Sequence, residues 1–185
     1  MKKVFIVLII FFTSNINAQI SKDEIIVIET SEGNITVHLD AKRAPITVNN
    51  FINLINSDYF SGSIFHRVIQ NFMIQGGGFD SEMNNLESSQ IIPNESGNGL
   101  SNLRGTIAMA RTSDPHSANA QFFINTKDNR TLNPKSGKWG YAVFGSVIDG
   151  MDVVDKISKK PTGPKGRFAS DVPVETILIK NITIE

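Results

Sequence analysis

The feature that most constrains the fold is a succession of short apolar segments separated by turn-forming residues. Residues 24–29 are rich in Ile and Val, and Ser31-Glu32-Gly33 then offers a turn into 35–39, where apolar and polar residues alternate. Because side chains alternate between the two faces of a strand, this pattern predicts a β-hairpin. Further short strands are predicted at 65–70, 72–75, 105–110, 121–125, 141–147 and 176–184.

Only two segments have the period of a helix. Pro45 suits a first helical turn, since its ring presets φ and its missing N–H costs nothing there. Apolar residues follow at i, i+3, i+4 and i+7, namely Val48, Phe51, Ile52 and Ile55. A second helix is predicted at 150–157. Many short strands with two helices predict a mainly β fold, a closed or nearly closed antiparallel barrel whose ends are plugged by the helices.

The amino terminus is typical of a secretory signal peptide. Two lysines precede an uncharged apolar stretch at 4–12, and small or polar residues lead to Ala18. We interpret 1–18 as the signal peptide and 19–185 as a single domain, with an uncleaved membrane anchor as the alternative. The chain has no cysteine, which excludes disulfides and a lipid-modified cysteine. We expect an exported protein, in the periplasm of a bacterium rather than fully secreted, with no membrane attachment after signal cleavage.

The charge balance excludes several classes of partner. There are 18 basic and 18 acidic residues with no long run of either sign, so we expect no binding to nucleic acid.

His38 and His116 lie far apart in sequence without carboxylates at metal-ligand spacing, so no metal site is expected. Ser113, Asp114 and His116 contain the residue types of a hydrolase triad, but they crowd into one short loop, whereas such triads assemble from separate elements.

Residues 65–79 combine one cation and one amide with large apolar side chains. If two adjacent strands form here, Arg67 and Gln75 can meet over a shared apolar floor. The run ends in three glycines, which permit close approach of a ligand or a neighbouring strand. The alternative is an ordinary strand with a surface arginine and a glycine turn. A second segment, 105–111 followed by 120–125, again pairs polar residues with aromatic ones.

Together with 140–145, these segments resemble the cyclophilin family of peptidyl-prolyl isomerases, in the same order and with similar separations. The resemblance covers essentially all of the chain after the signal peptide. It implies an eight-stranded antiparallel β-barrel capped by two α-helices. It also implies catalysis of cis/trans exchange at X-Pro bonds of proline-containing polypeptides, without a cofactor. We expect the protein to be a monomer.

The resemblance assigns roles to individual residues. The family's catalytic arginine falls on Arg67, and Ala110 lies where the substrate backbone passes closely. Arg111 occupies the next contact position, where many eukaryotic members have Asn. The proline pocket falls on Phe72, Met73, Phe123 and Leu132, and its polar rim on Gln75 and Gln121.

Two departures from many eukaryotic members concern ligands more than chemistry. Thr131 stands where they have a tryptophan before the pocket leucine, and Tyr141 stands where they have a histidine. Because family members that bind cyclosporin use this tryptophan to contact the drug, we expect weak cyclosporin binding. Trp139 lies in a different part of the pattern and is not counted as a replacement.

Two other functions compete with catalysis. The pocket also suits a module that captures proline-containing segments as a chaperone or assembly partner, with incidental turnover. A third hypothesis is a barrel that binds a small apolar ligand inside. The density of Ile and Val at inward positions argues against it.

We expect His66 to be structural, because isomerisation transfers no proton and strict alternation points its side chain away from Arg67.

Overall fold

The computed structural model describes residues 24–88 and 90–185, so the predicted signal peptide at 1–18 lies outside the described residues. Within them, the chain forms ten strands, two α-helices and one 3₁₀ helix. The bounds are β1 (Glu24–Thr30), β2 (Gly33–Leu39), α1 (Pro45–Asn56), β3 (Ser63–Ile69), β4 (Met73–Asp80), β5 (Thr106–Met109), β6 (Phe122–Asn125), η1 (Arg130–Leu132), β7 (Val143–Asp149), α2 (Met151–Ser158), β8 (Thr162–Lys165), β9 (Phe168–Pro173) and β10 (Ile179–Ile184).

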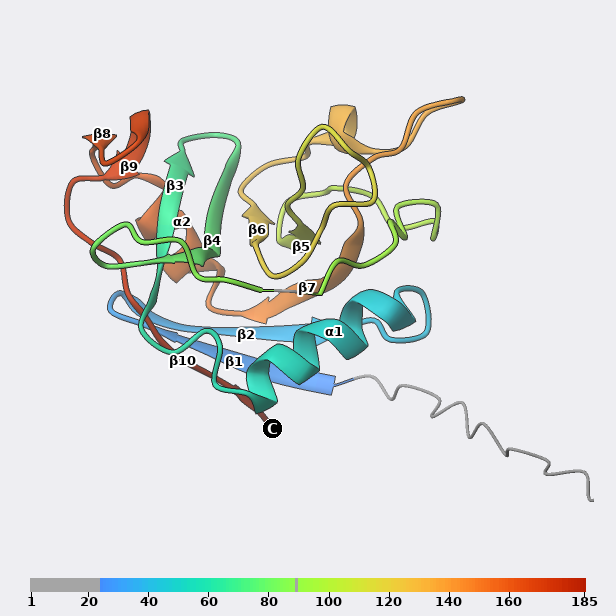
Figure 1. Ribbon diagram of the computed structural model, residues 1–185, viewed down its shortest axis with the longest axis horizontal. Coiled ribbons are helices and arrows are strands. Elements are labelled where there is room, and N and C mark those ends of the chain that lie inside the picture. Colours follow the sequence, from blue (N-terminus) through green and yellow to red (C-terminus); the bar gives the residue numbers. More distant parts are fainter. Residues whose placement is uncertain (1–23, 89) are drawn as a thin grey trace, which may run out of the picture.

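Eight of the strands form one antiparallel sheet that curls into a nearly closed barrel (Figure 1). Their order is β10-β1-β2-β7-β5-β6-β4-β3. The two outer strands approach each other, because the Phe65 N–H donates to the Ile177 carbonyl at 3.0 Å and the Gly62 N–H donates to the Ile179 carbonyl at 3.0 Å. The predicted barrel is therefore confirmed.

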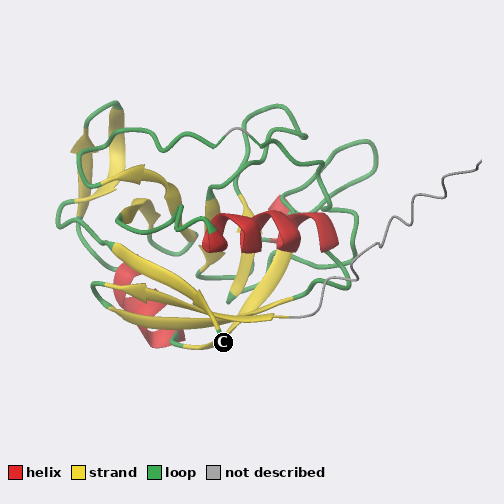
Figure 2. Cartoon of the chain, turned by 60° about the horizontal axis from the view of Figure 1, so that its bottom comes forward, coloured by secondary structure: helices red, strands yellow, loops and turns green. Residues whose placement is uncertain are grey.

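The two predicted helices are also confirmed, and they lie on opposite sides of the barrel (Figure 2). Pro45 is in the first turn of α1, as expected from its fixed φ. Helix α2 buries Val154 and Ile157. No helix within the described ranges is long and apolar enough to cross a membrane.

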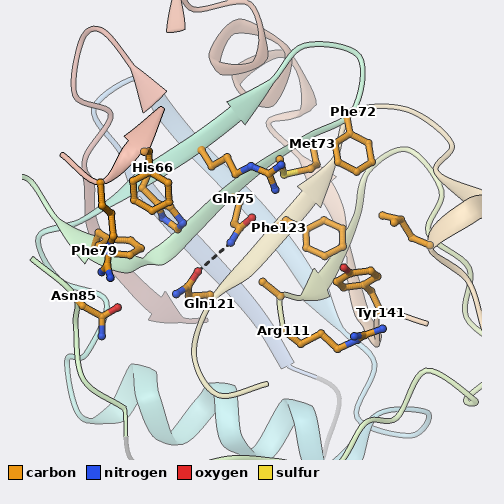
Figure 3. A pocket seen from close by; sticks show the side chains of 15 residues that line it. His66, Phe72, Met73, Gln75, Phe79, Asn85, Arg111, Gln121, Phe123 and Tyr141 are labelled. Atoms are coloured by element: carbon orange, nitrogen blue, oxygen red, sulfur yellow. Dashed lines mark hydrogen bonds between the residues drawn. The ribbon is translucent and has the colours of Figure 1, made fainter. Parts of the chain in front are cut away.

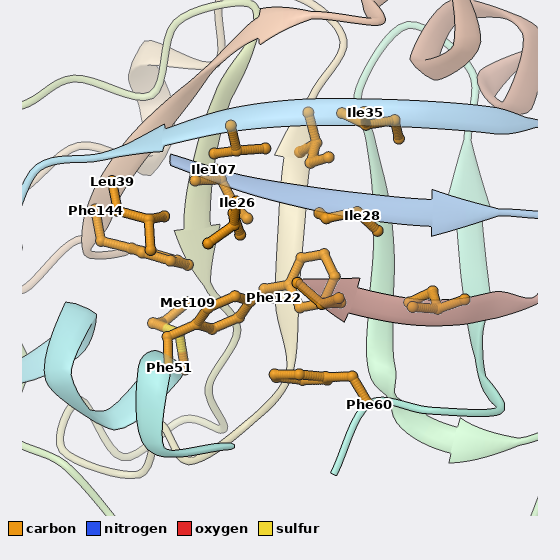
Figure 4. Close-up of a cluster of buried hydrophobic side chains, with 14 of the residues drawn as sticks. Ile26, Ile28, Ile35, Leu39, Phe51, Phe60, Ile107, Met109, Phe122 and Phe144 are labelled. Carbon is orange, nitrogen blue, oxygen red and sulfur yellow. The ribbon is translucent and has the colours of Figure 1, made fainter. Parts of the chain in front are cut away.

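Large apolar side chains fill the barrel (Figure 4). The ring of Phe51, on α1, lies 5.5 Å from that of Phe122 and 5.1 Å from that of Phe144, measured between centroids. Aliphatic side chains from the strands complete the packing, among them Ile26, Ile28, Ile35, Leu39 and Ile107. This packed interior argues against a small-ligand site inside the barrel.

The three glycines at 76–78 lie inside β4 rather than in a turn. They allow close packing on the strand, as a Cβ on Gly78 would lie 2.4 Å from Cδ of Gln121. Gly77 has φ of 77°, a conformation that side-chain-bearing residues rarely adopt, and a Cβ there would lie 2.9 Å from the Phe60 ring. The expectation of close packing is met, but in the interior of a strand.

The hairpin β8–β9 is absent from the sequence-based prediction. Its two strands pair with each other in a separate sheet, and β9 contacts β3 of the barrel. Most of their side chains are exposed or half-buried, so the segment lacks the apolar alternation that marks a strand. Pro164 further weakens the strand signal.

Candidate active site

Strand register places the main polar and apolar groups of the site in one row. Arg67 on β3 lies opposite Gln75 on β4, Gln75 lies opposite Phe123 on β6, and Phe123 lies opposite Ala108 on β5. Directly opposite residues share a face of a sheet. Their strand neighbours, such as Ile74, belong to the barrel core, so this row faces outward.

An apolar pocket lies at one end of this row. Met73 and Phe123 are only 2% and 4% exposed, and with Ala108 and Val143 they form a small cluster separate from the barrel core. Met73 and Phe123 form the floor of an open cleft of about 700 Å³. Half-buried apolar side chains surround it, namely Phe72, Leu132 and Tyr141 (Figure 3).

Asparagine side chains fix the loop that carries Leu132. Nδ2 of Asn129 donates to the Phe72 carbonyl at 2.7 Å and to Oδ1 of Asn125 at 2.7 Å. Asn125 in turn donates to Oδ1 of Asn102 at 3.2 Å. Because these groups are buried and bonded to each other, they hold η1 at a defined distance from β4.

Two glutamines form a polar bridge across the middle of the cleft. Nε2 of Gln75 donates to Oε1 of Gln121 at 2.9 Å (Figure 3). The backbone N–H of Ala110 donates to the Gln121 carbonyl at 2.9 Å, which ties the segment after β5 to the segment before β6. Amide groups along a cleft are suited to hydrogen bonding with a peptide backbone.

Arg67 lies beside this bridge with its side chain 40% exposed, so its guanidinium is accessible from the cleft. Its Nε lies 3.7 Å from Oδ2 of Asp171, on β9. Asp171 has φ of 68°, in the left-handed region. Sequence reasoning missed Asp171, because the hairpin that carries it gives no strand signal.

Arg111 forms a rigid wall of the cleft. Its guanidinium carbon lies 4.6 Å from the centroid of the Tyr141 ring, and the group donates to the carbonyls of Gly140, Thr112 and Trp139 at 3.2, 2.9 and 3.1 Å. A cation stacked on an aromatic ring and bonded to three carbonyls is fixed in place. Arg111 therefore lines the site as expected, with much of its donor capacity already used.

The far end of the cleft holds residues that the sequence analysis left out of the site. They are His66, Phe79, Asn85, Arg167 and Phe168. His66 contacts Phe79 and Phe168, with ring centroids 4.6 and 5.8 Å apart. A register shift in β3 between Phe65 and Arg67 breaks the strict alternation that predicted His66 to point away from Arg67.

His66 is 1% exposed, and its Nδ1 has no hydrogen-bond partner. Burial, with smaller effects from the nearby cations Arg67 and Arg167, lowers the pKa of His66 to about 4. The imidazole is thus neutral at physiological pH, in agreement with a structural role.

The structure brings all ten predicted site residues to this one cleft. It does not bring together a hydrolase triad. Nδ1 of His116 accepts a hydrogen bond from the backbone N–H of Asn94 at 3.1 Å, and the Asp114 carboxylate accepts one from the backbone N–H of His116 at 2.9 Å, not from its imidazole. Among residues 24–88 and 90–185, no cluster of three His, Cys, Asp or Glu side chains is arranged to hold a metal ion.

Comparison with known proteins gives consistent matches. The family model described as cyclophilin type peptidyl-prolyl cis-trans isomerase/CLD matches residues 25–184. The peptidyl-prolyl cis-trans isomerase of Acinetobacter baylyi is 47% identical over 170 residues, covering 92% of this chain and 90% of the relative. Peptidyl-prolyl cis-trans isomerase B of Escherichia coli is 50% identical over 159 residues, covering 84% of this chain and 96% of the relative.

Solved structures agree with these matches. The crystal structure of a cyclophilin type peptidyl-prolyl cis-trans isomerase from Cryptosporidium parvum matches with a TM-score of 0.71 and 27% identity, over 89% of this chain and 98% of that chain. The barrel, its two helices and the sequence matches over most of the chain lead to one conclusion. The chain belongs to the cyclophilin family of peptidyl-prolyl cis-trans isomerases.

Proposed function

We propose that this cleft accelerates X-Pro rotation in exported or envelope polypeptides and thereby assists their folding, with Arg67 as the catalytic donor. The observation that carries the proposal is the position of an accessible guanidinium beside an apolar pocket, on one face of adjacent strands.

Rotation about an X-Pro bond is slow because amide resonance resists it. The barrier is about 18–20 kcal/mol, and unaided exchange takes on the order of tens to hundreds of seconds. Twisting the bond destroys the resonance, makes the proline nitrogen pyramidal and basic, and reduces the charge on the carbonyl oxygen. A catalyst therefore has to grip one side of the bond and offer a donor to the nitrogen.

The apolar pocket supplies the grip. Its floor of Met73 and Phe123 is nearly free of solvent, and Phe72 and Leu132 stand at its edges. A pyrrolidine ring bound there is held while the residue before it rotates. The same apolar surroundings favour a twisted amide, which is less charge-separated than the planar one.

Arg67 supplies the donor. Its guanidinium stays protonated and presents N–H groups in a fixed plane, so it can bond the nitrogen as the lone pair appears. A charged hydrogen bond contributes about 1.5–3 kcal/mol, whereas an acceleration on the order of 10⁵-fold needs about 7 kcal/mol. Arg67 is therefore not sufficient alone.

We assign the rest of the acceleration to desolvation and to fixation of the peptide on both sides of the proline. The Gln75–Gln121 bridge and the Ala110 backbone offer hydrogen-bonding groups along the cleft, and Arg111 and Tyr141 form its wall. Holding the peptide in this way converts binding energy into a lower barrier only where the contacts strengthen in the transition state.

A short-peptide assay separates a catalyst from the alternative, a binding module for proline-containing segments. Wild-type protein at a small fraction of the peptide concentration should accelerate cis/trans exchange many times over, because each molecule turns over repeatedly. Peptide binding without acceleration would favour the binding module.

The exported location is part of the proposal, and the sequence of residues 1–18 supports it. A reporter that is active only outside the cytoplasm, fused after Ala18, should become active in a bacterial host. A matched fusion with Asp in place of two apolar residues within 4–12 should stay inactive. Equal activity of the two fusions would contradict export.

We also propose weak cyclosporin binding by a monomeric protein. Thr131 offers no indole to the drug, and the exposed Trp139 packs against His116, with ring centroids 5.1 Å apart. The IC50 for cyclosporin should be much higher than that of a tryptophan-containing cyclophilin, and Thr131→Trp should lower it. An equally low IC50 in the wild type would contradict this expectation.

A further inference from the structure

The Gln75–Gln121 bridge divides the cleft into two ends of different chemistry. The proline pocket lies on one side of it, while His66, Phe79 and Asn85 lie on the other (Figure 3). Arg167 and Phe168, from the tip of the β8–β9 hairpin, complete this second end. A peptide that fills the proline pocket and continues past Arg67 can enter it.

The cation at this end is fixed by aromatic rings. The guanidinium carbon of Arg167 lies 4.7 Å from the centroid of the Phe79 ring and 5.9 Å from that of Phe168. Stacking engages the planar faces of a guanidinium and leaves its N–H edges for other partners. Phe79 and Phe168 also pack edge to face at 5.3 Å, so the platform under the cation is itself rigid.

Among residues 24–88 and 90–185, Arg167 has no acidic partner of its own. None of the ion pairs formed within the described part of the chain includes it. Asp80, near Asn85 in sequence, turns its carboxylate to the backbone N–H groups of Glu82 and Asn84 and to the Asn84 amide, each at 2.9 Å.

Two cations act on this end of the cleft. The charges of Arg67 and Arg167 both lower the pKa of the buried His66, so both lie near its ring. Of the carboxylates in the part of the chain that the structure describes, that of Asp171 alone pairs with either of them, and it lies by Arg67. An anionic group entering here finds an oriented, unpaired guanidinium above an aromatic wall.

We propose that this end of the cleft, formed by His66, Phe79, Asn85, Arg167 and Phe168, is a subsite for an acidic side chain of the polypeptide substrate. Asp or Glu a few residues from the proline is the group that fits. The inference rests on the proposed function for the direction of the peptide through the cleft. It adds a substrate preference that the proline pocket cannot supply.

Binding of matched peptides tests the subsite. The host is an alanine-rich peptide with one X-Pro bond, and Glu, Gln or Lys is placed in turn at each of the positions flanking the proline dipeptide. At one position, Kd for the Glu peptide should be about threefold or more below that for the Gln peptide, as for a partly exposed ion pair. Kd for the Lys peptide should be the highest, and these differences should shrink in high salt.

Three variants identify the residue responsible. Arg167→Gln should abolish the preference for Glu, and Arg167→Lys should retain part of it because the charge is kept without the planar fork. Arg43→Gln is the control, since Arg43 is an exposed arginine before α1 that pairs with Asp40 and lines no part of the cleft. It should bind every peptide as the wild type does. Circular dichroism of each variant confirms that it is folded.

The Kd ratios test the subsite, and the exchange rates test catalysis, so failure of one can be told from failure of the other. Equal Kd for Glu and Gln peptides at every position, a Glu preference that survives in Arg167→Gln, or binding of the Lys peptide as tight as that of the Glu peptide at the preferred position would each overturn the subsite. Exchange rates of the all-alanine peptide are measured in parallel. If the wild type binds but does not accelerate it, catalysis fails while the Kd ratios still decide the subsite.

Discussion

At the scale of single residues, the contact between Arg67 and Asp171 connects the proposed donor to a hairpin outside the barrel. Nε of Arg67 lies 3.7 Å from the Asp171 carboxylate, and both side chains are partly exposed. An ion pair of this kind adds little stability but limits the orientations of a long side chain. Asp171 is therefore a positioning residue for Arg67.

Asp171→Asn should lower kcat/KM for X-Pro peptides by about twofold to fivefold, with most of the effect in kcat, because the guanidinium loses its charged neighbour. Asn tolerates the left-handed φ of 68°, so the free energy of unfolding should stay within about 0.5 kcal/mol. Asp149→Asn, at an exposed position at the end of β7, is the matched control. An unchanged kcat in Asp171→Asn would remove this role.

His66 gives the stability of the fold a pH dependence. Its pKa is about 4 in the folded protein and about 6.5 in the unfolded chain, so below pH 6.5 protons bind preferentially to the unfolded chain. The contribution of the neutral His66 to the free energy of unfolding is complete above pH 6.5 and is lost as the pH falls through 4. Between pH 7 and 4, the free energy of unfolding should fall by about 3 kcal/mol more in the wild type than in His66→Phe.

Urea denaturation at a series of pH values measures this difference. His66→Phe keeps an aromatic ring against Phe79 and Phe168 but cannot titrate. Carboxylates with lowered pKa, such as Asp155, affect both proteins equally and cancel in the comparison. Parallel curves for the two proteins would contradict the account of His66 as a neutral, buried imidazole.

At the scale of elements, helix α1 depends on a distant carboxylate for its N-terminal cap. Ala44, at the N-cap position, has no side-chain bond to offer. Instead, Glu95 accepts hydrogen bonds from the Ile46 N–H at 3.1 Å and the Thr47 N–H at 2.7 Å, and a third from the Thr47 hydroxyl at 2.7 Å. The long loop after β4 thus supplies the anion that a helix N-terminus favours.

Glu95→Ala should lower the free energy of unfolding by about 1–2 kcal/mol, because the helix N-terminus loses these hydrogen bonds. Glu87→Ala, at an exposed position on the same loop, should change it by less than about 0.5 kcal/mol. Thermal and urea denaturation of both variants test the difference. Equal stability of the two would show that Glu95 is not the cap.

The β8–β9 hairpin is the element that most extends the site beyond the barrel. It carries Arg167 and Phe168 to the far end of the cleft and Asp171 to Arg67. Its aromatic contact with the barrel runs through Phe168, which packs on Phe79 and His66. Changes in this hairpin are therefore expected to alter substrate preference more than the stability of the barrel.

At the scale of the whole molecule, the barrel and both helices were predictable because their apolar residues recur with the period of a strand or of a helix. Ile35, Val37 and Leu39 mark β2 by their period of two, and Phe51 marks the buried face of α1. The ten site residues came from the resemblance to cyclophilins, and the strand register then explains why Arg67, Gln75 and Phe123 converge.

Other features were not predictable, because they depend on contacts between distant segments. Glu95 lies about 50 residues from the helix it caps, so no local pattern connects them. The exposed hairpin around Gly166 lacks the apolar alternation of a strand. The sequence therefore did not predict that this hairpin forms and places Arg167 and Asp171 at the cleft. The position of His66 followed from a bulge in β3, which periodicity alone does not reveal.

Rotation of X-Pro bonds by this cleft, with Arg67 as donor, is tested by the exchange rate of a short X-Pro peptide with wild type and Arg67→Ala. Both proteins are compared at equal concentration after circular dichroism confirms the same fold. We predict that Arg67→Ala slows turnover by more than about tenfold, as expected for the loss of one charged hydrogen bond in the transition state. Wild-type turnover in a folded Arg67→Ala variant would contradict the account.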